Sequence, residues 1–288
     1  MPVENTSTKV TLTHPKGSTA EILLYGVTVV SWKVNGAERL FVSSKASLDG
    51  SKPIRGGIPV VFPCFGPPSH PDHSKLAQHG FARSETWKFD SIIMDNQAGV
   101  SVRLSLEPND HIKSIYSKPF SLTYVVTLAE QQLSTDIHVG NPPTSHEALE
   151  FQALLHNYIR APSDEVKVSS LKGLSYYDKT EKTEEAKANA KTETRDQVDV
   201  KTTTDSVYED ASLHYKVTWP GHGLEIRAKN LKDVVIWNPQ EEGSKIGDME
   251  AEGWKRYICV EPGFVRGFVK LEPGKFWIGQ QVLTVDSE

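Results

Sequence analysis

An alternation of apolar and polar residues with a period of two is the feature of this sequence that most constrains its fold. It is clearest in residues 100–106 (VSVRLSL) and 213–219 (LHYKVTW). Successive side chains of a strand point to opposite faces of a sheet, so this pattern predicts half-buried β-strands. Similar segments recur at residues 10–14, 20–25, 27–34, 39–42, 87–94, 120–128, 133–139, 149–159, 224–229, 234–237, 257–261 and 275–284.

Turn residues separate most of these segments, as at residues 66–68 (GPP), 141–143 (NPP) and 272–274 (EPG). Helical signals are short and are confined to residues 47–51 and 109–117. No strand–helix–strand alternation of the kind that builds a parallel sheet is visible. Many strands with few helices therefore predict an all-β fold of antiparallel sheets packed on sheets.

Residues 179–201 depart from this pattern because they are rich in Thr, Glu and Lys and almost without apolar side chains before Val198. Such a composition is typical of a solvated loop or an exposed hairpin. The segments before and after it have the same strand character, and no Pro/Gly/Ser-rich break separates them. We therefore expect one domain over residues 1–288, with 179–201 as an excursion from it.

Charge and hydropathy exclude several kinds of partner. The formal net charge of -5 and the absence of a Lys/Arg-rich stripe argue against nucleic acid. No apolar run approaches the roughly 20 residues that cross a bilayer, and the amino terminus lacks a secretory signal pattern. Cys64 and Cys259 both lie in apolar stretches, which suits reduced core residues. We expect a cytoplasmic protein that acts as a monomer and binds neither nucleic acid nor membrane.

Two segments offer cationic and polar groups at positions where the chain leaves a strand. Arg55 precedes two glycines that allow close backbone approach, and residues 78–83 (QHGFAR) place Gln78, His79 and Arg83 around an aromatic residue. A guanidinium can bind an oxyanion with its planar fork. Taken singly, each arginine is more simply explained as a surface residue, because arginine is usually exposed.

Two further segments offer a candidate acid and a candidate base. His156 comes late in the apolar stretch 151–159, and Glu261 ends the apolar stretch 257–261 before a Pro-Gly pair. A histidine in a buried strand is more often a hydrogen-bonded core residue than a catalyst. Glu272 stands before an identical Pro-Gly pair, which shows that this tripeptide also occurs as ordinary turn chemistry.

Other kinds of site have weaker support. His70, Asp72, His73 and His79 imitate a metal cluster, but no strand or helix is predicted to orient them. The chain has no G-x-S-x-G elbow, no phosphate-binding loop and no dinucleotide fingerprint. We therefore predict neither a metal nor another cofactor.

Together and in this order, the segments resemble the aldose 1-epimerase (galactose mutarotase) superfamily, and within it the glucose-6-phosphate 1-epimerase branch. The resemblance is carried by residues 49–59 (DGSKPIRGGIP), 78–83 (QHGFAR), 154–158 (LLHNY), 235–239 (VIWNP) and 258–263 (ICVEPG). It implies a large antiparallel β-supersandwich with a shallow sugar cleft. It also implies a mutarotase that interconverts the α and β anomers of a hexose 6-phosphate.

The resemblance assigns roles to particular residues. It makes His156 the general acid and Glu261 the general base. Protonated His156 would donate to the ring oxygen while ionised Glu261 takes the proton of the anomeric hydroxyl. A nearby carboxylate, for which Asp205 is a candidate, would have to keep the pKa of His156 from falling on burial.

The substrate-binding positions implied by the resemblance are Arg55, Gln78, His79, Arg83, Asp205 and Asn238. Two arginines are more than a neutral sugar needs, so a sugar phosphate is the expected ligand. Two alternatives stay open at this point. One is a mutarotase of unphosphorylated aldoses, and the other is a non-catalytic carbohydrate-binding β-sandwich that uses Trp237 and Trp254 as aromatic platforms.

Overall fold

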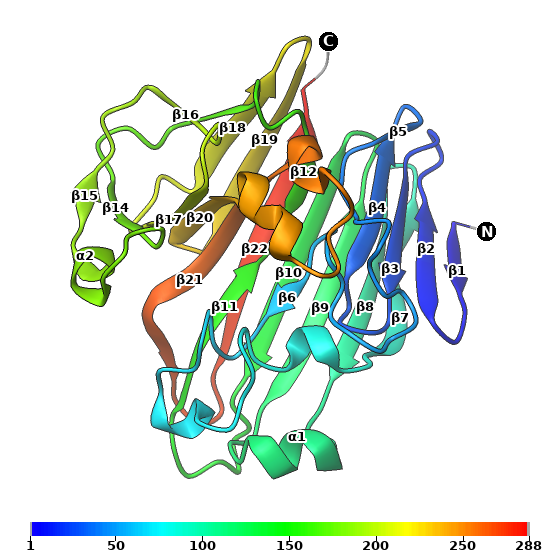
Figure 1. Cartoon of the computed structure of the whole chain (residues 1–288). Helices are drawn as coiled ribbons and strands as arrows, with labels where there is room; N and C mark the ends of the chain where they lie inside the picture. The colour runs from blue at the N-terminus through cyan, green and yellow to red at the C-terminus, as the bar shows by residue number, and fades with distance from the viewer. Residues whose placement is uncertain (1, 287–288) are drawn as a thin grey trace.

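The computed structural model describes residues 2–286, whose regular structure consists mainly of three β-sheets (Figure 1). The first sheet contains five strands in chain order: β1 (Val3–Asn5), β2 (Lys9–Thr13), β3 (Thr19–Leu23), β4 (Val29–Val34) and β5 (Ala37–Glu38). The second contains nine, in spatial order β16 (Gln197–Asp199), β13 (Lys167–Ser169), β18 (His214–Trp219), β19 (His222–Lys229), β22 (Phe276–Val285), β10 (Gln132–Gly140), β9 (Ser121–Leu128), β8 (Gly99–Leu106) and β7 (Lys88–Asn96).

The third sheet positions the candidate site. Its spatial order is β15 (Lys191–Thr192), β14 (Ser175–Asp178), β17 (Thr204–Tyr208), β20 (Asp233–Asn238), β21 (Tyr257–Leu271), β11 (Leu149–Leu155) and β6 (Val60–Val61), and β12 (Tyr158–Arg160) continues beside β21. The paired strands of all three sheets run antiparallel, so the prediction of an all-β antiparallel fold is confirmed.

Helices are few and short. They are α1 (Asp110–Ile115), α2 (Glu184–Ala188) and the 3₁₀ turns η1 (Pro71–His73), η2 (Ala82–Ser84), η3 (Gln240–Lys245) and η4 (Gly253–Arg256). The helix predicted within 109–117 is confirmed as α1, whose first turn is capped by Asn109 Oδ1 accepting from Ile112 N at 2.8 Å.

The helix predicted at 47–51 is wrong, because this segment forms bends instead of a helical turn. The Asp49 carboxylate accepts the backbone N–H of Ser51 at 3.0 Å and its hydroxyl at 2.6 Å. Such local side-chain bonds offer the backbone an alternative to the helix.

Residues 179–192 form an exposed hairpin together with β14, as predicted for the charged stretch 179–201. The last part of the stretch differs, because β16 pairs with β13 at the edge of the nine-stranded sheet and Val198 and Val200 are buried. Strands β14 and β15 pair antiparallel, and α2 caps the tip of the hairpin, away from the main sheets in Figure 1. Thr183 Oγ1 begins α2 by accepting from Ala186 N at 3.1 Å.

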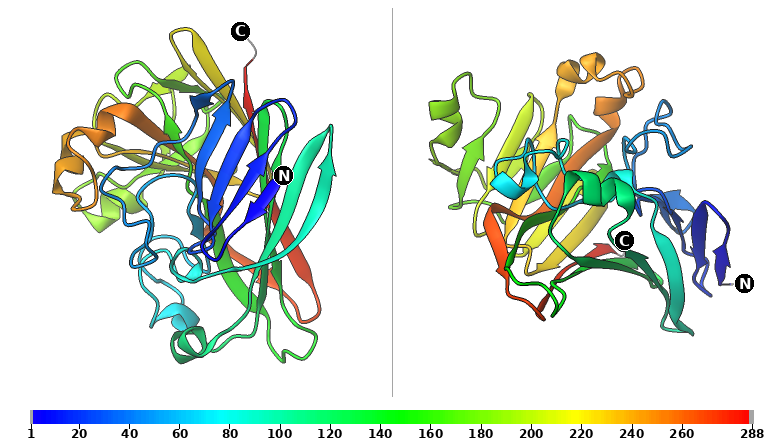
Figure 2. Two further views of the ribbon diagram at one scale, coloured as in Figure 1. Left: turned by 90° about the vertical axis from the view of Figure 1, so that its right-hand side faces the viewer. Right: turned by 90° about the horizontal axis from the view of Figure 1, so that it is seen from below.

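The eight- and nine-stranded sheets pack face to face (Figure 2). Between them, Phe151 packs edge-on against Trp277, with ring centroids 5.4 Å apart. Asn157 and Gln281 exchange hydrogen bonds of 2.8 and 2.7 Å across the same interface. The main core cluster contains residues from Val3 to Val285, and one domain over 1–288 stays a prediction. Both cysteines are free and buried.

The two faces of β20 and β21 have different surroundings. Ile236 and Val260 point into the main core, whereas Trp237, Cys259 and Glu261 point to the opposite face. That opposite face of the eight-stranded sheet carries the candidate site.

Candidate active site

Strand register places His156 opposite Glu261. On either side of this position, Leu154 pairs with Gly263 and Tyr158 pairs with Cys259, so the residue between them faces residue 261. His156 Nδ1 lies 3.5 Å from Glu261 Oε1. The two residues that the resemblance named as acid and base are therefore cross-strand neighbours with side chains on one face.

Both side chains leave polar atoms without a partner. His156 is 9% exposed and Glu261 is 1% exposed, and neither His156 Nδ1 nor Glu261 Oε2 makes a hydrogen bond. Buried polar atoms are nearly always paired, so unpaired ones call for an explanation. Two such atoms on facing residues suggest groups that are kept available for a substrate.

A pocket of about 260 Å³ opens over this pair. The structure brings together seven of the eight predicted site residues there, all except Asn238. The lining consists of Arg55, Phe65, Gly66, Pro67, Gln78, His79, Arg83, His156, Lys179, Asp205, Val235, Trp237 and Glu261.

Asn238 is buried and lies outside this pocket, contrary to its expected role in substrate binding. Its Nδ2 donates to the backbone oxygens of Trp254 and Tyr257 at 2.9 and 2.7 Å. Its Oδ1 accepts from Gln240 N at 2.8 Å. Every hydrogen-bonding group of the side chain is engaged with the backbone, so Asn238 holds the end of β20 in place.

The two arginines enter the pocket from different loops. Arg55 Nε donates to Asp248 Oδ1 at 2.9 Å, and its Nη1 lies 3.3 Å from the Tyr158 hydroxyl. The two glycines after it are required by close backbone contact, because a Cβ on Gly56 would lie 2.4 Å from the Phe41 carbonyl oxygen. This contact explains why a tight Gly-Gly pair follows the arginine.

Arg83 is anchored at only one point. Its Nη2 donates to the backbone oxygen of Gln78 at 2.9 Å, while its Nε is buried without a partner. The turn that carries it contains His79 at φ 68° and Gly80 at φ 70°, where a Cβ would lie 2.1 Å from the Phe62 carbonyl oxygen. A strained histidine at a pocket wall is typical of functional sites.

Lys179 lines the pocket, and the sequence had assigned it only to the solvated excursion. It follows directly after β14, and its backbone N–H donates to the Asp205 carbonyl at 2.8 Å. Its ammonium lies 5.3 Å from the centre of the Phe65 ring. No local pattern marks this lysine, because its position depends on the pairing of β14 with β17.

Asp205 lies on β17, two strands away from Glu261. It pairs with Trp237, and Glu261 pairs with the neighbouring Val235, so the two carboxylates sit on adjacent rows of one sheet face. Burial raises the pKa of Asp205. The carboxylate next to His156 is thus Glu261, not Asp205 as the sequence suggested.

Burial shifts the pKa values of His156 and Glu261 towards values that favour their neutral forms. It lowers the pKa of His156, and the positive charges of His79, Arg83 and Arg55 lower it further. Burial and the nearby Asp205 raise the pKa of Glu261. The favoured arrangement has the proton on Glu261 and a neutral His156, the reverse of the charge state expected from the sequence.

Aromatic rings frame the pair. The His156 ring stacks on Tyr158, with centroids 4.7 Å apart and planes 8° apart, and meets Trp237 edge-on at 5.9 Å. Of the two predicted aromatic platforms, Trp237 lines the pocket, whereas Trp254 is buried and does not line it.

One cluster near the pocket has the donor types of a metal site. Ligand atoms of His156, Cys259 and Glu261 lie within 4.8 Å of one another. A metal would need the Cys259 thiolate, but burial and Glu261 raise the pKa of this thiol well above its usual value. Three cationic side chains line the adjoining pocket and would repel a divalent cation. The environment therefore favours an anionic ligand.

A cleft with an opposed His and Glu on an antiparallel supersandwich defines a mutarotase-type epimerase, and comparison with known proteins agrees. Residues 8–284 match the family described as Aldose 1-epimerase. A Cenchrus ciliaris protein is 32% identical over 96% of this chain and 84% of its own length. One from Escherichia coli K12 is 30% identical over 87% of this chain and 81% of its own. Both carry the name "Putative glucose-6-phosphate 1-epimerase". The chain belongs to the aldose 1-epimerase family.

Solved structures show the same fold at low identity. A Salmonella typhimurium protein described as a "putative mutarotase" has a TM-score of 0.86 at 22% identity, with 99% of this chain and 93% of its own covered. Galactose 1-epimerase from Lactobacillus acidophilus has a TM-score of 0.75 at 14% identity, with 99% and 97% covered. The galactose mutarotase-like fold expected from the sequence is confirmed. Within residues 2–286, no helix is long and apolar enough to span a bilayer.

Proposed function

We propose that this epimerase interconverts the α and β anomers of glucose 6-phosphate and related hexose 6-phosphates, with His156 and Glu261 as its proton-transfer pair. One observation carries the proposal: His156 and Glu261 face each other at 3.5 Å, each with an unpartnered buried atom, in a pocket that also holds three cationic side chains. The names of the relatives from Cenchrus ciliaris and Escherichia coli support the same substrate.

The reaction needs two proton transfers and no redox change. When the ring opens, Glu261 accepts the proton of the anomeric hydroxyl, the bond between C1 and the ring oxygen breaks, and His156 protonates that oxygen. The aldehyde then rotates about its bond to C2. On closure the ring oxygen returns its proton to His156, and Glu261 protonates the new anomeric oxygen. Each positioned group contributes on the order of 10² to 10⁴ in rate.

The directions in which the pKa values of His156 and Glu261 are shifted fit the ring-closing half of this cycle. A protonated Glu261 beside a neutral His156 is the state that ring closure requires. Ring opening requires the same single proton on His156 instead. A phosphate dianion at Arg55 and Arg83 offsets the positive charges that lower the pKa of His156, and so favours this second arrangement. The substrate's phosphate would therefore prepare the acid as well as orient the sugar.

Arg55, Arg83 and Lys179 are the proposed phosphate-binding groups. Arg55 is held by Asp248 and Tyr158, so its position is fixed. Arg83 has a free buried Nε, and the Lys179 ammonium makes no ion pair among the described residues. Charge-assisted contacts from such groups orient a phosphate strongly. Gln78, His79 and Asp205 remain as proposed contacts to sugar hydroxyls.

We also infer that the protein acts as a monomer in the cytoplasm. Few large hydrophobic side chains of the described residues are exposed, and they lie on three segments of the chain: Leu48, Ile92 with Ile93, and Phe276. Both cysteines are reduced and buried, which suits a reducing compartment.

An NMR exchange experiment tests the proposed reaction. The protein is expected to accelerate anomer exchange of glucose 6-phosphate far more than that of free glucose at equal concentration. Equal acceleration of both sugars would identify a mutarotase of unphosphorylated aldoses. Detectable binding of glucose 6-phosphate with exchange at the uncatalysed rate would identify a carbohydrate-binding protein instead.

A further inference from the structure

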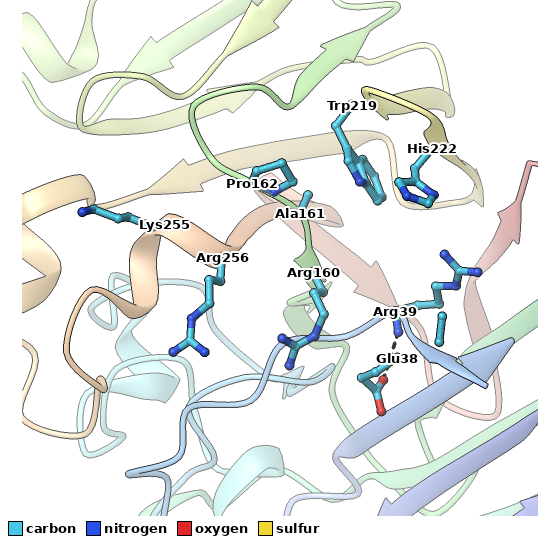
Figure 3. A pocket seen from close by; sticks show the side chains of 10 residues that line it. Glu38, Arg39, Arg160, Ala161, Pro162, Trp219, His222, Lys255 and Arg256 are labelled. Atoms are coloured by element: carbon cyan, nitrogen blue, oxygen red, sulfur yellow. Dashed lines mark hydrogen bonds between the residues drawn. The ribbon is translucent and has the colours of Figure 1, made fainter. Parts of the chain in front are cut away.

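A second pocket, of about 340 Å³, lies away from the active site and shares no lining residue with it (Figure 3). Its wall is built from the end of β5, the end of β12, the hairpin between β18 and β19, and η4. The volume is at the lower end of the range for small-molecule sites.

The charge of this basic pocket opposes that of the whole chain. Four cations line it (Arg39, Arg160, Lys255 and Arg256) against one carboxylate, while the chain carries a net charge of -5. Lys255 and Arg256 form ion pairs with Glu252 and Glu250 outside the lining, so the unpaired positive charge comes from Arg39 and Arg160. The carboxylate, Glu38, is already occupied: its Oε1 accepts from the backbone N–H groups of Trp32, Arg39 and Leu40, and its Oε2 from the Ser31 hydroxyl. Glu38 therefore forms no ion pair with these cations among the described residues.

Two of the arginines have no carboxylate partner among the described residues. Arg160 Nε donates to the Leu40 carbonyl at 3.1 Å, and Arg39 Nη2 to the Val34 carbonyl at 3.4 Å. Arg39 Nε is buried and makes no hydrogen bond. An unpaired buried donor at a pocket wall indicates a missing acceptor.

The cations are also crowded together. The backbone N–H of Arg160 donates to the carbonyl of Arg39 at 2.9 Å, so the two residues are cross-strand neighbours. The guanidiniums of Arg160 and Arg256 both lie over the Phe41 ring, 5.8 and 5.7 Å from its centre. Glu250 pairs with Arg256 and offsets part of this positive charge, whereas no carboxylate pairs with Arg39 or Arg160 among the described residues.

The opposite wall is aromatic. Trp219 and His222 pair across the hairpin turn, and their rings lie 5.8 Å apart with planes inclined by 37°. Figure 3 shows both rings at one side of the pocket, with Pro162 next to them and Arg160 and Arg256 on the other side. An aromatic wall facing arginines suits a ligand with a flat ring and an anionic group.

We propose that the basic pocket binds a phosphate ester that carries a planar ring, of the size of a nucleoside monophosphate. The phosphate lies against Arg39, whose side chain extends towards His222 (Figure 3), and supplies the acceptor that Arg39 Nε lacks. The ring stacks on Trp219 and His222. This site is independent of the sugar-phosphate site at His156 and Glu261.

The test measures binding of AMP by calorimetry in an Arg55→Ala/Arg83→Ala background, which removes the arginines of the active site. We expect one bound AMP per chain. Arg39→Ala should weaken binding at least about tenfold. Trp219→Leu should weaken AMP binding but leave that of inorganic phosphate unchanged. Arg103→Ala, which removes an exposed arginine of β8 outside both pockets, should have no effect.

Several outcomes would overturn the proposal. These are no binding at millimolar AMP, equal loss of binding in Arg39→Ala and Arg103→Ala, or glucose 6-phosphate binding as tightly as AMP. Thermal denaturation of each variant checks that it is folded. If Arg39→Ala is not folded, Arg39→Gln provides the same test at the same position with a side chain of similar length.

Discussion

The tripeptide Glu-Pro-Gly occurs twice, at Glu261 and at Glu272, and the two copies fold differently. Glu261 lies inside β21, is 1% exposed and faces His156. Glu272 follows the end of the same strand and is exposed in a turn, where Gly274 adopts φ 74°. The neighbouring strands β20 and β11 bury the first copy, whereas solvent surrounds the second. The chemistry of a glutamate is thus decided by the strands that flank it.

The largest expected difference between the two copies is in catalysis. Glu261→Gln keeps the shape of the side chain but removes the group that accepts the proton, so anomer exchange of glucose 6-phosphate should fall by about 10² to 10⁴. Glu272→Gln is the matched control and should leave exchange within about twofold of the unaltered protein, since it changes an exposed turn residue. NMR exchange rates measure both. A fully active Glu261→Gln would remove Glu261 from the mechanism.

Substitution by alanine should have different effects at the glycines of the two Glu-Pro-Gly copies. A Cβ on Gly263 would lie 2.9 Å from the Leu154 Cβ, so Gly263→Ala should destabilise the fold by about 1–3 kcal/mol and slow exchange by displacing β11. Gly274→Ala meets no atom closer than 3.6 Å, but its φ of 74° costs a side chain about 1–2 kcal/mol. Urea denaturation measures the free energies of unfolding. Slower exchange in Gly274→Ala would contradict this contrast.

The phosphate-binding proposal depends on the cations around the first copy. Arg83→Ala should raise the KM for glucose 6-phosphate about 10- to 100-fold, because it removes charge-assisted hydrogen bonds to the phosphate. The KM for free glucose should change much less. Steady-state kinetics on both sugars, with Arg103→Ala as a control, measures the ratio. Equal loss on both sugars would separate Arg83 from phosphate recognition.

The pH dependence of stability offers a further contrast. The pKa of folded Glu261 is raised above its ordinary 4.5, so the unfolded chain loses this proton first, and stability falls as pH rises from 4.5 towards the raised value. Glu261→Gln removes this loss, so the variant should gain stability relative to the unaltered protein as pH rises above 4.5. Glu272→Gln should show no such trend. Thermal melts of both variants at several pH values from 4.5 upwards measure this effect. A change in stability by Glu261→Gln that does not vary with pH would contradict the raised pKa of Glu261.

The smallest expected effect concerns the excursion. Lys179→Ala should raise the KM for glucose 6-phosphate by about three- to tenfold, since one flexible ammonium contributes less than a fixed guanidinium. Lys201→Ala, in an exposed lysine of the same stretch, is the control and should change nothing. If both variants behave alike, Lys179 does not contact the phosphate.

Much of the fold could be predicted because its signals are local. The two-residue alternation marked most strands, and Asn109 marked the start of α1 through its own side-chain cap. The helix predicted at 47–51 was wrong because the Asp49 carboxylate bonds to Ser51 in a bend. The same residue types can begin a helix or form a bend, so the composition of this segment does not decide between them. Asn238 was expected to bind substrate because it lies in a motif of the family. A motif gives the order of residues along the chain but not the direction in which each side chain points.

The sequence by itself determined that this chain builds antiparallel sheets, that the charged residues 179–192 form an exposed excursion, and that His156 and Glu261 are candidates for acid and base. Only the tertiary structure decided that these two residues face each other, that Lys179 joins the pocket, and that burial favours the proton on Glu261. The physical reason is the distance along the chain over which each interaction acts. Alternation and capping act between residues close in the chain, whereas strand register, burial and pKa depend on neighbours that come from distant parts of it.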